Sequence, residues 1–175
     1  MTRDSSLADK IQMIANHGQK MKYHHEVTGV NSRLDTIQAA VLDVKLNYLD
    51  EYISSRNEMA RFYDTAFKDI QEVEVPTRAS YSDHVFHQYT IKVNNGQRDN
   101  LKAYLGDLGI PSMVYYPIPL YKQNAFNKYV TSKFNLQITE NLCQVVLSLP
   151  IHTEVDYDEM SFISDSIKRF FEHKI

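Results

Sequence analysis

The chain has 175 residues, of which 43% are hydrophobic and 23% are charged, a balance typical of one soluble globular domain or of a small domain with part of another. With 19 Lys and Arg residues against 22 Asp and Glu residues, the formal charge is −3, which leaves no basic excess for a nucleic-acid backbone. The single cysteine excludes a disulfide framework, and there is neither a ~20-residue apolar span nor a secretory signal, so we expect a cytoplasmic protein that binds neither nucleic acid nor membrane.

Helical patterns dominate the first part of the chain. Leu7, Ile11 and Ile14 at helical spacing predict a short helix with a serine cap, broken at residues 16–18, where Gly18 is placed to end it in a left-handed conformation. Residues 19–32 show no sustained period and are expected to form an irregular loop.

A long apolar stripe then runs through residues 34–67 without Gly or Pro, which predicts one amphipathic helix. Asn31 or Ser32 is the expected cap, with Asp35 in the first turn, where the helix dipole favours negative charge. Because such a helix is long for a globular protein, we expect a bend near residues 54–55 and a role in linking two bodies of structure or lining a subunit interface.

Strands and helices alternate in the rest of the chain. The pattern predicts strands at 84–93, 112–116 and 147–150, and helices at 99–108, opened by Asp99 and closed by Gly109, and at 121–129, 138–146 and 156–173. We therefore expect an α+β chain with a division near residue 72: a largely helical part at 1–72, and a small domain at 73–175 whose one mainly antiparallel sheet is covered by helices.

The densest group of polar side chains lies in residues 16–33. Three histidines precede Asn31 and Arg33, which stand just before the predicted helix, where free backbone N–H groups and a forked guanidinium attract anions. The pattern fits a phosphate or carboxylate site, and it fits equally a capped helix start with solvated side chains.

Other chemistry is less well supported by the sequence. His17, His24 and His25 lack the spacing of a zinc site, so hydrogen-bonded loop histidines are the better interpretation and no metal site is expected. Cys143 lies on the apolar face of a predicted helix, as a buried structural thiol does.

Aromatic residues mark a second candidate site. Tyr115 and Tyr116 end a predicted strand before a proline, where they can present phenols to a ligand or plug the edge of a sheet. His84, His87 and Tyr89 alternate on another predicted strand, so one face of it could approach a site, although cross-strand packing is the better explanation.

Several motifs in this order resemble one family. They are Asn-His-Gly-Gln at 16–19, Tyr-His-His at 23–25, Gly-Val-Asn-Ser-Arg-Leu-Asp-Thr-Ile-Gln-Ala-Ala-Val-Leu at 29–42, His-Gln-Tyr-Thr-Ile at 87–91, Gly-Ile-Pro at 109–111, the run at 115–120 and Leu-Pro at 149–150. Together they resemble the DegT/DnrJ/EryC1/StrS family, the nucleotide-sugar aminotransferases that use pyridoxal 5′-phosphate (PLP) and have the aspartate-aminotransferase fold.

The resemblance implies that this chain is a C-terminal half. Family members are about twice as long, and their Schiff-base lysine lies upstream of the region represented here, so we assign no catalytic residue in this chain. Residues 1–72 then correspond to the end of the large PLP-binding domain with its linking helix, and residues 73–175 to the small domain.

The resemblance also implies roles for particular residues. In the family, the residue matching Asn31 reaches across a homodimer to the PLP phosphate of the partner subunit, and Arg33 lies beside it. Tyr23, His24 and His25 match the entrance for the nucleotide sugar. Tyr115 and Tyr116 match the segment that faces the sugar, so the resemblance implies that they bind substrate as well. Many relatives have His where this chain has Tyr121, so the details of sugar binding are expected to differ.

The implied reaction is amino transfer from an amino acid, probably glutamate, to a nucleotide-linked keto-sugar, in surface-polysaccharide or amino-sugar biosynthesis. Two alternatives stay open: a sugar dehydratase of the same family, and a non-catalytic truncated half that acts only in subunit assembly. If this chain occurs without the large domain, apolar side chains on residues 34–67 that the domain would normally cover are exposed. We therefore expect the isolated chain to self-associate.

Overall fold

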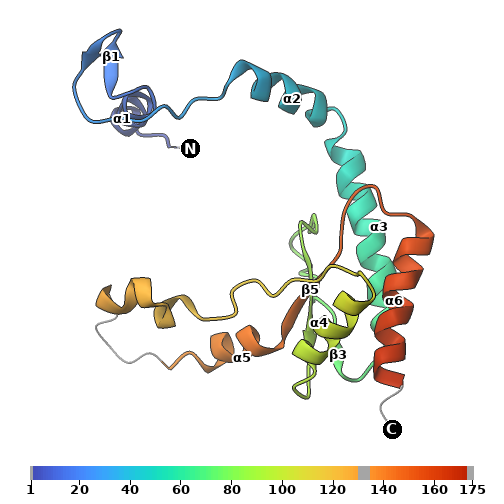
Figure 1. Cartoon of the computed structure of the whole chain (residues 1–175). Helices are drawn as coiled ribbons and strands as arrows, with labels where there is room; N and C mark the ends of the chain where they lie inside the picture. The colour runs from blue at the N-terminus through green and yellow to red at the C-terminus, as the bar shows by residue number, and fades with distance from the viewer. Residues whose placement is uncertain (1, 130–134, 173–175) are drawn as a thin grey trace. The chain divides into compact units, whose positions relative to one another are not determined.

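The computed structural model describes residues 2–129 and 135–172. Its elements form two compact units, Met1–Leu49 and Asp50–Ile175 (Figure 1). The first unit holds helices α1 (Ser5–Ala15) and α2 (Thr36–Leu46) and a small hairpin, and the second holds the remaining helices and a three-stranded sheet. The expected division near residue 72 stays a prediction.

Helix α1 begins at Ser5, one of the two serines that were expected to cap it. Asp4 is its N-cap and accepts a hydrogen bond from the Leu7 N–H group at 3.0 Å, so the expected serine cap is wrong. At the other end, His17 and Gly18 both have positive φ angles, and the Gly18 N–H group donates to the Met13 carbonyl at 2.8 Å. The predicted left-handed end is therefore confirmed, with His17 sharing the role given to Gly18.

Residues 19–32 are more regular than expected. Strands β1 (Gln19–Met21) and β2 (His24–His25) form an antiparallel hairpin, and Tyr23 in its turn has a φ of 68°. The chain then returns along the end of α1, where the Val30 N–H group donates to the Ile14 carbonyl at 2.8 Å and that of Ser32 to the Ala15 carbonyl at 2.9 Å. Long-range pairing of this kind leaves no periodic signal in the sequence.

Two glycines allow this return. A Cβ atom on Gly18 would lie 1.7 Å from the Val27 carbonyl oxygen, and one on Gly29 would lie 2.0 Å from the Gly18 nitrogen. Both obstacles are backbone atoms, which cannot swing away as the end of a side chain can. Only glycine therefore fits at either position.

A Gly29→Ala variant should lose the contact between the hairpin loop and α1, because overpacking against backbone costs about 1–3 kcal/mol. Amide hydrogen exchange at Gly18 and Val30 measures the loss. The matched control is Gly106→Ala near the C-terminal end of α4, where a Cβ atom meets nothing within 4 Å and should leave protection at Val30 unchanged. Unchanged protection at Val30 in Gly29→Ala would contradict the close approach.

The predicted long helix is two helices. Helix α2 ends at Leu46 and α3 (Leu49–Phe67) begins after Asn47 and Tyr48, so the bend expected near residues 54–55 is wrong. Asn47 is the C-cap of α2, and its amide donates to the Asp43 carbonyl at 3.2 Å. An asparagine that bonds to nearby backbone in this way competes with the helical pattern, which explains the break.

The sheet of the second unit is antiparallel, as predicted. Its strand order is β3 (Val73–Glu74), β4 (Tyr89–Val93) and β5 (Val146–Leu149), with Tyr89 paired to Leu149 and Ile91 to Leu147. Buried and half-buried residues alternate along β4, so one face of the strand lies in the core.

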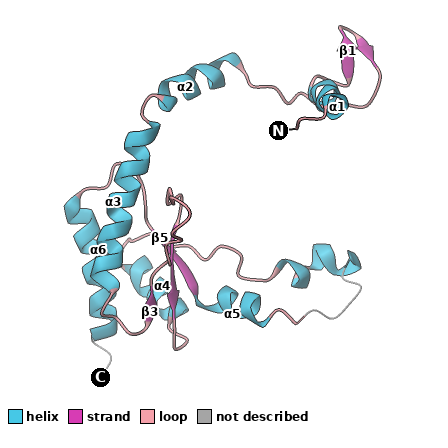
Figure 2. Cartoon of the chain, turned by 180° about the vertical axis from the view of Figure 1, so that it is seen from behind, coloured by secondary structure: helices cyan, strands magenta, loops and turns pink. Residues whose placement is uncertain are grey.

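Helices complete this core (Figure 2). It joins residues of α3, α4 (Arg98–Asp107) and α6 (Tyr157–Glu172) to the sheet, and its fully buried side chains include Met59, Tyr63, Phe67, Tyr89, Ile91, Leu101, Leu105, Leu147 and Ile167. The expectation of a sheet covered by helices is thus confirmed for this unit. By contrast, α2 has no buried residue at all.

Between α4 and α5 (Gln137–Val145) the chain departs from the expected elements. The predicted strand at 112–116 is a single bridge between Met113 and Ser148, and the predicted helix at 121–129 is two 3₁₀ helices, η1 (Leu120–Lys122) and η2 (Asn124–Tyr129). Prolines at 117 and 119 remove the N–H groups that a regular ladder or helix needs here.

Smaller corrections concern the ends of elements. Gln97, not Asp99, is the N-cap of α4, whereas Gly109 follows that helix with a φ of 74°, as expected. The terminal helix ends at Glu172, and His173 lies outside the described residues. Across residues 2–129 and 135–172, none of the helices combines the length and the apolar character needed to cross a membrane.

Candidate functional site

Asn31 and Arg33 follow the loop that folds back on α1. Asn31 pairs with Asn16 in an antiparallel bridge, which fixes its backbone beside the end of the helix. Both Asn31 and Arg33 are exposed, and within the described part of the chain neither side chain has a hydrogen-bond or ion-pair partner. An amide and a forked guanidinium are thus available to hold an anionic group.

The helix itself contributes less to this site than the sequence suggested. Helix α2 begins only at Thr36, with Asp35 as its N-cap, so neither Asn31 nor Ser32 caps it. The Asp35 N–H group donates to Gln38 Oε1 at 3.3 Å, and the acidic side chain of Asp35 stands at the positive end of the helix. The start of α2 thus lies beyond Asn31 and Arg33 with Asp35 at its N-cap, and an anion site at these two residues stays a prediction.

The hairpin brings Tyr23, His24 and His25 together at one turn. All three are exposed, and Tyr23 is 79% exposed with the Lys22 ammonium 5.1 Å from its ring centroid. His25 Nδ1 lies 2.8 Å from the His17 carbonyl oxygen, which orients that imidazole. Among the described residues no group of three or more His, Cys, Asp and Glu side chains could hold a metal ion.

The structure separates the two tyrosines of the second candidate site. Tyr115 lines a hollow of about 260 Å³ at the edge of the sheet, next to Met113. Tyr116 is 74% exposed, has a φ of 57° and does not line that hollow. A shared role in substrate binding stays a prediction for both residues, but they do not form one surface within this unit.

The other walls of this hollow were not predicted as a site. His87 and Gln88, which precede β4, line it together with Pro150 and Ile151, which follow β5. The sequence offered one signal, the alternation of His84, His87 and Tyr89. The structure divides these three residues, because Tyr89 is fully buried whereas the His84 ring accepts a hydrogen bond from the Phe86 N–H group at 2.9 Å. That turn also explains why β4 is shorter than expected.

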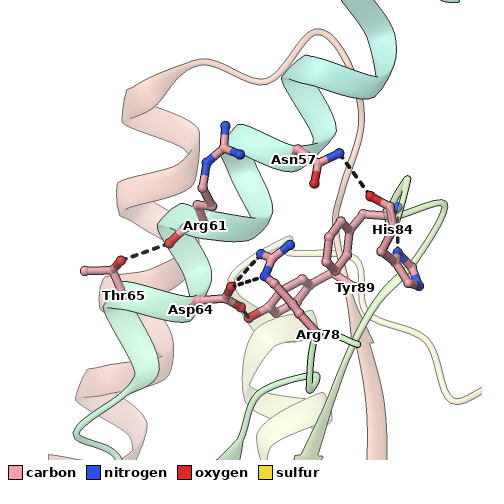
Figure 3. Close-up of polar contacts among 8 residues, drawn as sticks. Asn57, Arg61, Asp64, Thr65, Arg78, His84 and Tyr89 are labelled. Atoms are coloured by element: carbon pink, nitrogen blue, oxygen red, sulfur yellow. Dashed lines mark hydrogen bonds and ion pairs between the residues drawn. The ribbon is translucent and has the colours of Figure 1, made fainter. Parts of the chain in front are cut away.

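A polar cluster anchors the chain before β4 to α3 (Figure 3). Asp64 on α3 accepts hydrogen bonds from the Tyr89 hydroxyl at 2.7 Å and from Arg78 Nε at 3.0 Å. The Arg78 guanidinium also lies over the Phe86 ring, 4.4 Å from its centroid. Burial, followed by the hydrogen bond to Asp64, raises the pKa of Tyr89 far above its ordinary value, so this phenol is a donor and not a base.

Replacing Asp64 by Ala should therefore destabilise the second unit by about 1–3 kcal/mol, because the buried Tyr89 hydroxyl loses its acceptor. The matched Tyr89→Phe variant removes the hydroxyl itself and should cost less, about 1 kcal/mol. Urea unfolding followed by circular dichroism gives both values. Equal losses in the two variants would show that the unsatisfied hydroxyl is not the cause.

A second cluster holds η1 against α5. The Tyr121 hydroxyl donates to Glu140 Oε1, and Lys122 Nζ lies 2.9 Å from the same oxygen. The hydrogen bond from Tyr121, then that from Lys122, lowers the pKa of the Glu140 carboxyl. Tyr121 therefore has a local partner in this protein.

The far end of α5 is fixed to the core. Arg98 Nη1 donates to the Cys143 carbonyl at 3.2 Å, and Arg98 is itself buried at the start of α4. Cys143 is buried, as expected of a structural thiol. Helix α5 thus connects the core to the segment that carries Tyr115.

A Glu140→Gln variant should loosen η1. Since the folded state lowers the pKa of Glu140, the contact is present above the ordinary pKa of a glutamate and is lost as the pH falls. At neutral pH we expect amide exchange at Lys122 and Gln123 to become about two- to fivefold faster, and at acid pH the wild type should approach the variant. The exposed Glu58→Gln is the control. Equal exchange in all three proteins at neutral pH would contradict this role of Glu140.

Comparison with known proteins identifies the class. The model of the DegT/DnrJ/EryC1/StrS aminotransferase family matches residues 1–168, and the chain belongs to this family. Its two units have the mixed helices and small antiparallel sheets of a partial aminotransferase fold. The resemblance noted in the sequence is thereby confirmed.

Three proteins illustrate the match. The chain is 38% identical to the "Pleiotropic regulatory protein" of Geobacillus stearothermophilus, over 99% of this chain and 46% of that protein. It is 39% identical to the UDP-2-acetamido-2-deoxy-3-oxo-D-glucuronate aminotransferase of Pseudomonas aeruginosa, over 93% of this chain and 44% of that protein. It superposes on DesV of S. venezuelae, solved in complex with a ketimine intermediate, with a TM-score of 0.88 and 31% identity, over 100% of this chain and 47% of that chain. The chain spans about half the length of the curated relatives it matches.

Proposed function

We propose that the protein to which this chain contributes is a PLP-dependent aminotransferase. It transfers an amino group from an amino acid, with glutamate as the expected donor, to a nucleotide-linked keto-sugar in surface-polysaccharide or amino-sugar biosynthesis. The family match over residues 1–168 carries this proposal, and relatives named as transaminases of UDP-linked and dTDP-linked sugars support it.

The residues of this chain fit the cofactor. PLP carries a phosphate, and the exposed side chains of Asn31 and Arg33, which are without partners in the described structure, are donors of the kind that bind phosphate. When bound, PLP supplies the electron sink for amino transfer. In this proposal Asn31 and Arg33 hold its phosphate from across a subunit interface, and the catalytic lysine lies outside this chain.

The remaining candidate residues would orient the substrate. Tyr23, His24 and His25 at the hairpin turn offer a phenol and two imidazoles to the nucleotide sugar, and Tyr115 and Tyr116 offer phenols to its sugar. None of these groups has to take part in the chemical step. In this proposal they position the keto group for reaction. Positioning of this kind supplies much of the rate enhancement of a two-substrate reaction.

An exposed apolar surface supports the proposed homodimer. Ile37, Val41 and Val44 recur on one face of α2 and are 80%, 51% and 60% exposed. This is the surface that the sequence predicted to be exposed on residues 34–67, although in α3 the apolar residues Met59, Tyr63 and Phe67 are buried. Exposed apolar faces of this kind are typical of protein interfaces.

The test uses a full-length protein in which this chain follows the N-terminal half that its relatives possess. With PLP, glutamate and UDP- or dTDP-linked keto-hexoses, we expect the amino-sugar, identified by mass spectrometry. Loss of water from the sugar without amino transfer would show the dehydratase of the same family. No product from any keto-sugar or donor would refute the proposal.

Variants of the same protein test the role of the anion-binding residues. Asn31→Ala and Arg33→Ala should each weaken PLP binding about tenfold or more, since each removes a charge-assisted or neutral hydrogen bond to phosphate. Arg61→Ala, an exposed arginine on α3, is the control of equal charge. If PLP affinity is the same in the Arg33 and Arg61 variants, Arg33 does not bind the cofactor.

A further inference from the structure

A groove lies between α3 and α6, which Figures 1 and 2 draw side by side. Its volume is about 830 Å³, against about 260 Å³ for the hollow beside Tyr115. The residues that line it belong to α3, to α6 and to the turn between α3 and β3, so the groove is complete within the second unit. None of the residues proposed to bind cofactor or substrate lines it, and the proposed function leaves it without a role.

The floor of the groove is apolar. Phe62, Ala66 and Ile70 follow one another at a spacing of four residues, and each is only partly buried against the core. Phe171 of α6 lines the groove in the same way. The rings of Phe62 and Tyr157 meet edge to face with their centroids 5.7 Å apart, which ties the start of α6 to α3. The two helices therefore leave a contiguous apolar strip uncovered, as interaction sites do.

The rims of the groove are acidic. Asp69 and Glu72 lie on the side of α3, and Asp165 and Glu172 on the side of α6, with Lys168 as the one cation among the described lining residues. Four carboxylates against one ammonium match the formal charge of −3 of the whole chain, so acidic and basic residues outside the groove balance. The excess negative charge of this protein is thus concentrated at the groove.

Neighbouring cations neutralise only part of this charge. Asp165 Oδ1 lies 3.4 Å from Lys168 Nζ, and Asp69 lies 4.0 Å from an exposed lysine, a pairing that contributes little. Within residues 2–129 and 135–172, the side chains of Glu72 and Glu172 have neither a hydrogen bond nor an ion pair. Carboxylates on both rims are therefore available to cations from another molecule.

The length of the groove narrows the choice of occupant. Its lining begins at Tyr157 and ends at Glu172, which at 1.5 Å per residue follows α6 for about 22 Å, or four helical turns. A single metal ion does not fit, because the described residues hold no group of three His, Cys, Asp and Glu side chains for it. An amphipathic helix fits, since such a helix lays its apolar face in a groove and carries its charges on the flanks.

We propose that the groove between α3 and α6 is the docking site of a basic amphipathic helix, about four turns long, of a partner protein. The apolar face of this helix packs against Phe62, Ala66 and Ile70, and its Lys and Arg side chains pair with the carboxylates of both rims. The charge complementarity selects a basic partner, and the apolar floor selects an amphipathic one. The proposal does not depend on the proposed function, because it uses none of the same residues.

Synthetic peptides of about 15 residues test the proposal on the full 175-residue chain. One has Leu at helical spacing and Lys elsewhere, the second has the same composition with Leu on every side, and the third has Glu in place of Lys. We expect the first to gain helical circular dichroism and to shift the NMR methyl signals of Ala66 and Ile70. The other two should bind at least about tenfold more weakly. Shifts confined to Ile37 and Val41 would place the peptide on α2 and overturn the proposal.

Variants of the rims give the second readout. Asp69→Lys combined with Glu172→Lys should weaken binding of the first peptide about tenfold at low ionic strength and less at high salt. The neutral pair Asp69→Asn and Glu172→Gln should fall between this variant and the wild type. Glu51→Lys combined with Asp107→Lys is the control, because these exposed acids lie outside the groove and the total charge changes equally.

Three further results would each refute the docking site. The first is equal affinity of the two lysine double variants, and the second is equal affinity of the two Leu and Lys peptides. The third comes from competition with spermidine, which carries positive charge without an apolar face. If spermidine displaces the amphipathic peptide at an equal or lower concentration, the groove is a polyamine site. Displacement only at a large excess of spermidine supports recognition of the apolar face.

Discussion

The second unit depends on how α3 uses its two kinds of side chain. One kind is apolar: the side chains of Met59, Tyr63 and Phe67 are buried in the core against the sheet. On the same helix, Arg56 and Asp64 bind the irregular chain before β4, where backbone carbonyls and the Tyr89 hydroxyl would otherwise lie near apolar groups without partners. Because buried polar groups need partners, this docking decides where β4 starts and where His87 and Gln88 stand.

The first unit relies on a different constraint, the close approach of two backbone segments at Gly18 and Gly29. It presents Asn31, Arg33 and the hairpin residues at its surface, while α2 has no buried residue. An exposed surface with little core of its own gains order from what packs against it. This agrees with a chain that spans about half the length of its relatives and with residues proposed to act across a subunit interface.

Much of the fold followed from local pattern. The sequence predicted helices α1, α4, α5 and α6 and strand β5 close to their observed positions. Their signals are local: apolar residues at regular spacing, with Gly109 and Pro150 ending elements within a few residues. The break at Asn47 and the bridge at Met113 were not predicted, since both depend on hydrogen bonds that periodicity does not reveal. For the candidate site, the sequence named Tyr115 but not Gln88, which lines the hollow because Arg56 of α3 and the pairing with β5 hold the neighbouring backbone there.

The sequence by itself determined the family, because the run at residues 29–42 is long and specific enough to resemble one family. It also determined which segments are helical, because side-chain spacing along a helix is a local property. Only the tertiary structure decided that Tyr115 lines a hollow without Lys or Arg in its walls, whereas Tyr116 lies outside it. Such a hollow exists only where segments remote in the chain are fixed together, here by one arginine that binds three carbonyl groups.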